Sequence, residues 1–178
     1  KTMLKNYAAY HPSPAEVLTV VNDRLCDSNE AGMFVTAFVG VLQISTGKFT
    51  FSNAGHNYPL LRRQGGAFDW LKSETSFVLA GMETMEYQDF TEKLGVGDCL
   101  FLYTDGVTEA LNEEDAIYGD DRLKDTLNVP GTAEIYLEGL IDYVKDDIKS
   151  FAGQAAQADD ITMLALMLKE RGDEQTEL

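Results

Sequence analysis

The chain has 178 residues, a formal net charge of −16 at pH 7 and a hydrophobic fraction of 44%, which suit one acidic globular domain with a sizeable core. The charge argues against nucleic acid and anionic membrane surfaces as partners, because both are bound through clusters of Lys and Arg. The longest apolar runs are also far shorter than the roughly 18 residues of a membrane span.

Two helices are predicted before Gly32. Residues 1–10 have helical apolar spacing up to a His-Pro pair that begins at His11. A Ser-Pro-x-Glu capping box begins at Ser13 and predicts a second helix that ends near residues 27–29. The chain starts without Met, inside a helical pattern and with no signal peptide. We therefore expect a fragment of a longer protein.

After Gly32 the apolar period changes to two, which indicates strands. The expected strands cover residues 34–44, 49–53, 58–63, 67–71, 77–79, 87–94, 99–103 and 161–168. We expect residues 87–94 and 99–103 to pair as a hairpin around Gly97-Asp98. Helices are expected at 121–127 and from Thr132 to about Ile148.

The grouping of strands and helices in blocks favours a mostly antiparallel, layered α+β fold. We expect one domain over residues 1–168, without an internal boundary, and a charged tail at 169–178. Arg62 and Arg63 are expected on an exposed hairpin. Cys26 and Cys99 lack the spacing of metal ligands, so we expect buried thiols in a reducing compartment.

A candidate ligand follows the apolar run Cys99–Tyr103, which reads as a strand buried on both faces. The next motif is Thr-Asp-Gly, with its carboxylate at Asp105. We expect Gly106 to adopt a backbone conformation closed to other residues, so that the chain turns sharply after the carboxylate. A rigid strand that ends in Asp can hold an oxygen ligand for a cation. An ordinary Asp-Gly turn is the alternative.

A second acidic motif, Asp159-Asp160, stands just before the predicted strand 161–168. If this strand and 99–103 are antiparallel neighbours, opposite ends meet and the carboxylates of Asp105, Asp159 and Asp160 converge. Converging carboxylates repel one another unless protons or a cation neutralise them. Magnesium or manganese suits such oxygen-only ligands. A helix cap or turn is the alternative for Asp159-Asp160.

Four motifs occur in order along the chain, at 34–44, 52–60, 102–110 and 159–162. Together they resemble the SpoIIE/RsbU-type branch of the metal-dependent PPM serine/threonine phosphatases, over residues 1–168. The resemblance implies a layered β-sandwich flanked by helices, with two manganese or magnesium ions at one end. Asp105 matches the metal-binding Asp of the family's Thr-Asp-Gly motif. Asp159 matches the first Asp of its Asp-Asp/Asn motif, and Asp160 is assigned a supporting metal role.

The resemblance also implies a reaction. Asp105 and Asp159 would serve catalysis through a metal-activated water that attacks a phosphoserine or phosphothreonine. The substrate would be a phosphorylated regulator, such as an anti-anti-sigma-factor-like protein, in bacterial cytoplasm. An upstream sensor or receiver domain is expected in the parent chain. Asn53, Gly55 and His56 are expected to shape a nearby loop, although His56 could also touch phosphate or act as an acid.

The sequence departs from the family at its beginning. The family's first two metal motifs, a Gly-Asp-x-x-Asp-like segment and Asp-x-Ser-Gly-x-Gly, are absent. We therefore expect the first strands to be missing, ion binding to be weak or absent, and phosphatase activity to be impaired in this chain although the parent is active. Open sheet edges would favour a homodimer. The alternative is a non-catalytic, phosphatase-like module that binds a partner protein.

Overall fold

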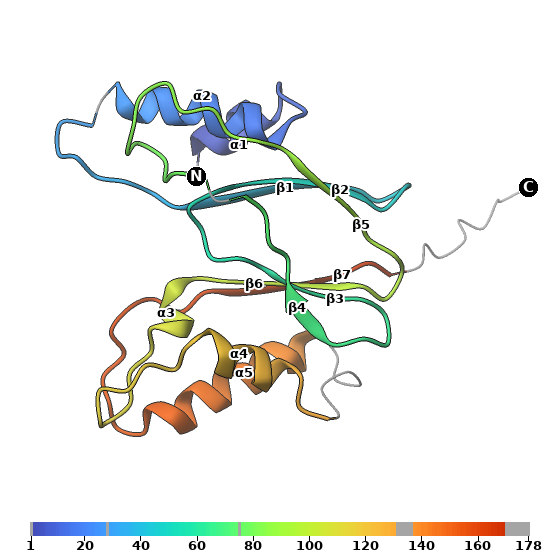
Figure 1. Cartoon of the computed structure of the whole chain (residues 1–178), viewed down its shortest axis with the longest axis vertical. Helices are drawn as coiled ribbons and strands as arrows, with labels where there is room; N and C mark the ends of the chain where they lie inside the picture. The colour runs from blue at the N-terminus through green and yellow to red at the C-terminus, as the bar shows by residue number, and fades with distance from the viewer. Residues whose placement is uncertain (1, 28, 75, 131–136, 170–178) are drawn as a thin grey trace, which may run out of the picture. The chain divides into compact units, whose positions relative to one another are not determined.

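The computed structural model describes residues 2–27, 29–74, 76–130 and 137–169 (Figure 1). Its contacts divide the chain into two compact units. The first unit comprises Lys1–His56 and Lys72–Leu94, and the second comprises Asn57–Leu71 and Gly95–Leu178. Each unit has its own antiparallel sheet. The predicted α+β class is therefore confirmed.

The first unit combines two helices with a three-stranded sheet. Its elements are α1 (Thr2–Ala8), α2 (Pro14–Cys26), β1 (Ala37–Gln43), β2 (Lys48–Ala54) and β5 (Phe90–Lys93), with strand order β1-β2-β5. The Ser13 side chain accepts the Glu16 N–H at 3.1 Å, so α2 begins at the predicted cap. The apolar face of α2 is buried in a cluster with residues of β1 and β2: Val17, Leu18, Val21, Ala37 and Ala54.

The second unit consists of three helices and a four-stranded sheet. Its strands are β3 (Leu60–Arg62), β4 (Phe68–Trp70), β6 (Cys99–Tyr103) and β7 (Met163–Met167), in the order β4-β3-β6-β7. Its helices are α3 (Asp105–Thr108), α4 (Asp120–Leu127) and α5 (Leu137–Ala152). The alternate residues Cys99, Phe101 and Tyr103 of β6 share a buried cluster with Leu123 of α4 and Val144 of α5. The buried strand that leads to Asp105 is therefore confirmed.

The predicted hairpin between residues 87–94 and 99–103 is wrong. The first segment forms only β5, which pairs with β2, whereas β6 pairs with β3 and β7. The reason lies in Asp98, whose carboxylate accepts hydrogen bonds from the Gly95 N–H, the Gln64 N–H and the Arg63 guanidinium, each at 2.9 Å. These bonds tie the turn at 95–98 to the β3–β4 hairpin instead of closing a hairpin between β5 and β6.

Two further local predictions differ from the structure. Residues 77–79 form no strand; only Leu79 pairs, in a bridge of two backbone hydrogen bonds with Val35. Arg62 is buried rather than exposed, because its guanidinium lies over the Phe68 ring, 4.9 Å from the centroid. Cation–π contact and burial of its aliphatic stem explain this position.

Some predictions fall outside the described residues. The expected start of the last helix at Thr132 lies there, as do tail residues 170–178, and α5 is described from Leu137 onwards. Within the described ranges, no helix combines the length and hydropathy that crossing a bilayer requires. One domain over residues 1–168 stays a prediction.

Candidate functional site

The site begins with the pairing of β6 and β7. The two strands are antiparallel neighbours in a continuous register from Cys99 opposite Met167 to Tyr103 opposite Met163. The end of β6, which leads into Asp105, therefore lies beside the beginning of β7, which follows Asp159-Asp160. The condition that the sequence left open is met, and the two acidic motifs are neighbours in the second unit.

Hydrogen bonds extend this pairing beyond the ends of both strands. The Thr104 N–H donates to the Thr162 carbonyl at 3.0 Å. The Thr104 hydroxyl accepts the Thr162 N–H at 3.1 Å and donates to the Asp160 carbonyl at 3.1 Å. The backbone on either side of Ile161 is thus attached to one side chain of the Thr-Asp-Gly motif.

Gly106 serves a different purpose from the predicted one. It lies in α3 and is not among the described glycines with positive φ, so the expected special backbone conformation is wrong. Instead, a Cβ added at Gly106 would lie 2.5 Å from the Asp160 carbonyl oxygen and 2.9 Å from its carbon. A glycine is needed here because the backbones of the two motifs touch.

The three candidate carboxylates are exposed. Asp105 Oδ1 accepts the Gly106 N–H at 3.0 Å, and Asp159 Oδ1 accepts the Asp160 N–H at 2.7 Å. Among the described residues, none of these carboxylates forms an ion pair with Lys, Arg or His. Since an ionised carboxylate has about four acceptor sites, oxygen lone pairs remain for a cation.

The donor set fits magnesium or manganese in kind but not in number. Asp105, Asp159 and Asp160 offer only hard oxygen ligands on two segments that touch. However, the described residues contain no group of three or more His, Cys, Asp or Glu side chains placed to hold one ion. These residues can therefore supply part of a coordination sphere.

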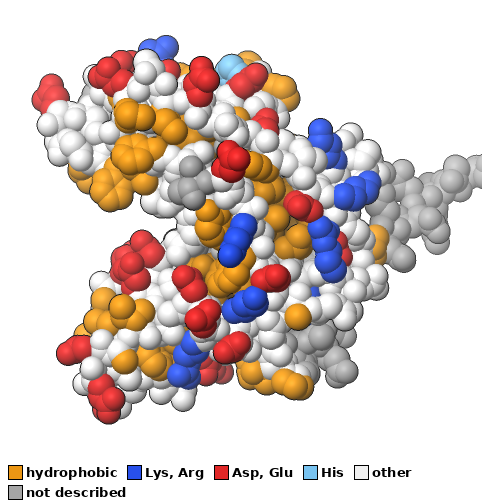
Figure 2. All heavy atoms as spheres, viewed as in Figure 1, with side chains coloured by type: hydrophobic (Ala, Val, Ile, Leu, Met, Phe, Trp, Pro, Cys, Tyr) orange, Lys and Arg blue, Asp and Glu red, His pale blue; other side chains and the backbone are white. Residues whose placement is uncertain are grey.

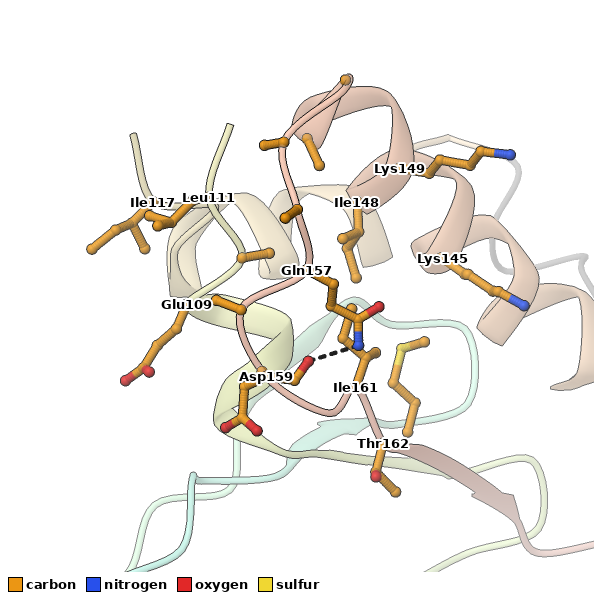
Figure 3. A pocket seen from close by; sticks show the side chains of 18 of the residues that line it. Glu109, Leu111, Ile117, Lys145, Ile148, Lys149, Gln157, Asp159, Ile161 and Thr162 are labelled. Atoms are coloured by element: carbon orange, nitrogen blue, oxygen red, sulfur yellow. Dashed lines mark hydrogen bonds between the residues drawn. The ribbon is translucent and has the colours of Figure 1, made fainter. Parts of the chain in front are cut away.

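A cavity of about 1080 Å3 borders Asp159 within the second unit (Figure 3). It lies between α5 and the loop that leads to β7, with Ile148 and Ile161 among its apolar lining residues. The Gln157 side chain donates to the Asp159 carbonyl at 2.7 Å. In Figure 3, Lys145 and Lys149 extend from α5 away from Asp159, so they do not neutralise its carboxylate.

Asn53, Gly55 and His56 belong to the first unit. Asn53 accepts the His56 N–H at 2.8 Å and donates to the His56 carbonyl at 2.9 Å. Gly55 has a φ of +68°, and a Cβ there would lie 2.6 Å from Val78 Cγ1. These contacts describe a loop shaped by Asn53 and Gly55, while the functional role of all three residues stays a prediction.

The displaced pKa values that the described carboxylates show belong to structural networks. Arg122 donates two hydrogen bonds to Asp147, at 3.0 and 3.1 Å, and this pairing lowers the pKa of Asp147. Tyr118 donates to the same carboxylate at 2.7 Å, and burial raises its own pKa to about 12. This network joins α4 to α5. A carboxylate with a displaced pKa can therefore be structural, and the displacement alone does not mark a functional site.

The net charge does not locate the site either. Figure 2 shows Asp and Glu side chains over the visible faces of both units, with Lys and Arg between them on the second. The site is recognised by backbone contact between two acidic motifs, and Thr104, Thr162 and Gln157 were not predicted as parts of it. Thr104 belongs to the Thr-Asp-Gly motif, but no task at the site was predicted for its side chain.

Comparison with known proteins agrees with this geometry. A family model described as Stage II sporulation protein E (SpoIIE) matches residues 1–169. The chain belongs to the SpoIIE family. The resemblance of its motifs to the SpoIIE/RsbU branch of the PPM phosphatases is therefore confirmed.

Two curated relatives of this SpoIIE-family chain are much longer than the matched region. Protein IcfG of Synechocystis is 31% identical over 148 residues, which are 83% of this chain and 23% of that protein. Phosphoserine phosphatase RsbU of Bacillus subtilis is 29% identical over 100 residues, 56% of this chain and 30% of RsbU. The chain thus spans less than a third of either relative.

Solved phosphatase domains share its fold. The SiaA PP2C domain of Pseudomonas aeruginosa has a TM-score of 0.75 at 18% identity, covering 93% of this chain and 66% of that one. The RsbU and RsbW domains of Rv1364c from Mycobacterium tuberculosis have a TM-score of 0.73 at 24% identity, and the match covers 94% of this chain and 45% of that one. The manganese-presoaked SpoIIE phosphatase domain of Bacillus subtilis has a TM-score of 0.68 at 13% identity, and the match covers 99% of this chain and 75% of that one. The SpoIIE-family chain therefore has the PP2C-type fold.

Proposed function

We propose that this chain supplies part of the divalent-metal site of a serine/threonine phosphoprotein phosphatase, with Asp105 and Asp159 as ligands and Asp160 in support. The observation that carries the proposal is the pair of hydrogen bonds at the Thr104 hydroxyl, which donates to the Asp160 carbonyl, 56 residues away, and accepts the Thr162 N–H, 58 residues away. Membership of the SpoIIE family supports the reaction type.

The residues have separable tasks in this proposal. Asp105 and Asp159 bind and orient the ions through carboxylate oxygens, while the contact of Gly106 with Asp160 holds the two segments together. Two manganese or magnesium ions, when bound, lower the pKa of a water and neutralise charge that develops on a transferring phosphate. The exposure of the three carboxylates leaves room for a protein-borne phosphate to approach.

The substrate class that we propose is a phosphorylated regulator protein, such as one resembling an anti-anti-sigma factor. Its support is the relative named phosphoserine phosphatase RsbU and the fold shared with a protein that joins RsbU and RsbW domains. A sensor or receiver domain in the parent chain is proposed because the chain matches only a small part of its two curated relatives. The free thiols Cys26 and Cys99 support a reducing, cytoplasmic location.

We further propose that the chain alone binds ions weakly and has little activity. Its described residues bring no three candidate ligands together. Strands β1, β4, β5 and β7 each form an edge of their sheet, and such edges support association of two copies. A monomer in light scattering would contradict the dimer. Micromolar, two-site manganese binding by this chain in calorimetry would contradict weak binding.

The deciding experiment uses the natural protein that contains this chain. Manganese affinity is measured by calorimetry, and hydrolysis of a phosphoserine peptide is measured with Asp105→Asn, Asp159→Asn and the exposed control Asp121→Asn. We expect both ligand variants to lose hydrolysis by more than about 100-fold and to bind manganese more weakly, while the control keeps both. A wild-type protein with neither manganese binding nor hydrolysis would favour the non-catalytic binding module.

A further inference from the structure

We propose that Thr104 is a positioning residue, whose hydroxyl sets the register between the two acidic segments and so controls metal affinity. This inference rests on the proposed function, because it assigns Thr104 a task at the same site. Thr104 touches neither ion nor substrate in this proposal. It acts through the backbone that carries Asp159 and Asp160.

The hydroxyl of Thr104 is both a hydrogen-bond donor and a hydrogen-bond acceptor. It donates its only proton to the Asp160 carbonyl and accepts the Thr162 N–H, each at 3.1 Å. These two backbone groups flank Ile161, so the hydroxyl fixes the chain on both sides of one residue. The Thr104 N–H adds a third bond, to the Thr162 carbonyl at 3.0 Å.

The position of Thr104 makes this use unusual. Thr104 is the N-cap residue of α3, where a Thr side chain ordinarily accepts an N–H from its own helix. Here the side chain makes no such capping bond. The hydroxyl therefore serves the distant segment rather than the local helix.

Gly106 makes the contact close enough for these bonds. Gly106 has no Cβ, so the backbone of α3 can lie against the Asp160 carbonyl. A Cβ at this position would lie 2.5 Å from the carbonyl oxygen. Asp160 and Thr162 are both exposed, so water can replace a lost hydrogen bond there. Loss of the hydroxyl should therefore disturb the relative placement of Asp105 and Asp159 more than it disturbs folding.

The test compares Thr104→Val, which keeps the shape but loses the hydroxyl, with Thr104→Ser, which keeps the hydroxyl. Thr91→Val, at an exposed position of β5, is the matched control. In the natural protein that contains this chain, we expect manganese affinity in calorimetry to fall about tenfold or more in Thr104→Val. Thr104→Ser should stay within about twofold of wild type, and Thr91→Val should match wild type.

Amide hydrogen exchange in the metal-free chain separates this inference from the proposed function. In Thr104→Val the Thr162 amide should exchange faster, while the Thr104 amide, which keeps its backbone acceptor, stays protected. Unchanged exchange at Thr162 would overturn the inference. So would faster exchange with unchanged manganese affinity. If wild type binds no manganese, the proposed function and the positioning role both fail, although the exchange result still reports whether the contact forms.

Discussion

Strand β6 has an aspartate close to each end, and the two carboxylates have opposite environments. Asp98 stands just before the strand, and its side chain is 7% exposed. Its carboxylate accepts hydrogen bonds from the Arg63 guanidinium and from two backbone N–H groups. Asp105, just after it, is exposed and accepts only the Gly106 N–H among the described residues. One carboxylate is used for folding, and the other remains available to a ligand.

The electrostatics of Asp98 follow from this pairing. Burial alone would raise its pKa, but the hydrogen bonds from Gly95, Arg63 and Gln64 outweigh burial and lower it. The backbone of Asp98 also accepts the Leu168 N–H at 3.2 Å, at the far end of the same β6–β7 pair that Thr104 closes. A position next to an apolar strand thus does not distinguish a structural aspartate from a candidate ligand. The partners of the carboxylate do.

The largest effect is expected from Asp98→Ala. It removes the three hydrogen bonds that the Asp98 carboxylate accepts from the Arg63 guanidinium and from the Gln64 and Gly95 amides. We expect the free energy of unfolding of this chain to fall by about 3 kcal/mol. Urea unfolding followed by circular dichroism measures it.

The matched control is Asp105→Ala, for which we expect a change within about 1 kcal/mol, because the exposed Asp105 carboxylate accepts only one hydrogen bond among the described residues, from the Gly106 N–H. Equal losses in the two variants would show that the two ends of β6 are used alike.

The Gly106→Ala variant tests the contact at the ligand end. The added Cβ would meet the Asp160 carbonyl oxygen at 2.5 Å, and backbone cannot move aside as a flexible side chain would. We expect a loss of about 2 kcal/mol in urea unfolding. In Gly95→Ala the added Cβ would come no nearer than 3.7 Å to Asp98. That control should be neutral or slightly stabilising, since Ala restricts the unfolded chain.

The pH dependence of stability sharpens the contrast further. The folded pKa of Asp98 lies below its unfolded value of about 3.9. Its contribution is therefore complete above about pH 5, well above the unfolded pKa, and is lost as the pH falls through the folded pKa. We expect wild type to exceed Asp98→Asn in stability at pH 7, and the difference to shrink towards pH 3. Urea unfolding at pH 7, 5, 4 and 3 measures it, and a constant difference would rule out a role of the charge.

Much of the fold could be predicted because its signals are local. The capping box at Ser13 identified the start of α2, and unbroken apolar runs identified β6 and β7. Whether these two strands are neighbours was left open by the sequence, and the β6–β7 pairing now meets that condition. An antiparallel pair brings opposite strand ends together, whatever length of chain separates them, so the segments of Asp105 and Asp159-Asp160 lie side by side.

The rest depends on partners that are remote in sequence. The turn signal Gly97-Asp98 was read as a hairpin, but Asp98 bonds to Arg63 and Gln64, 35 and 34 residues away. Likewise, Gly106 was assigned a backbone role, whereas its neighbour is the Asp160 carbonyl. A short window of sequence shows that a residue can turn or bond, but not which distant group it meets.

The smallest expected effect separates pairing from burial. Lys124 Nζ lies 2.6 Å from Asp69 Oδ1, yet the Asp69 side chain is 77% exposed, against 7% for Asp98. If the contribution of Asp98 to stability depends on its burial, Asp69→Asn should change the free energy of unfolding by less than about 0.5 kcal/mol, because water screens the exposed pair. Urea unfolding at low and high salt measures it. A loss near that of Asp98→Ala would mean that any cation partner is enough to make an aspartate structural. Asp105 would then stand apart only because no described cation lies beside it.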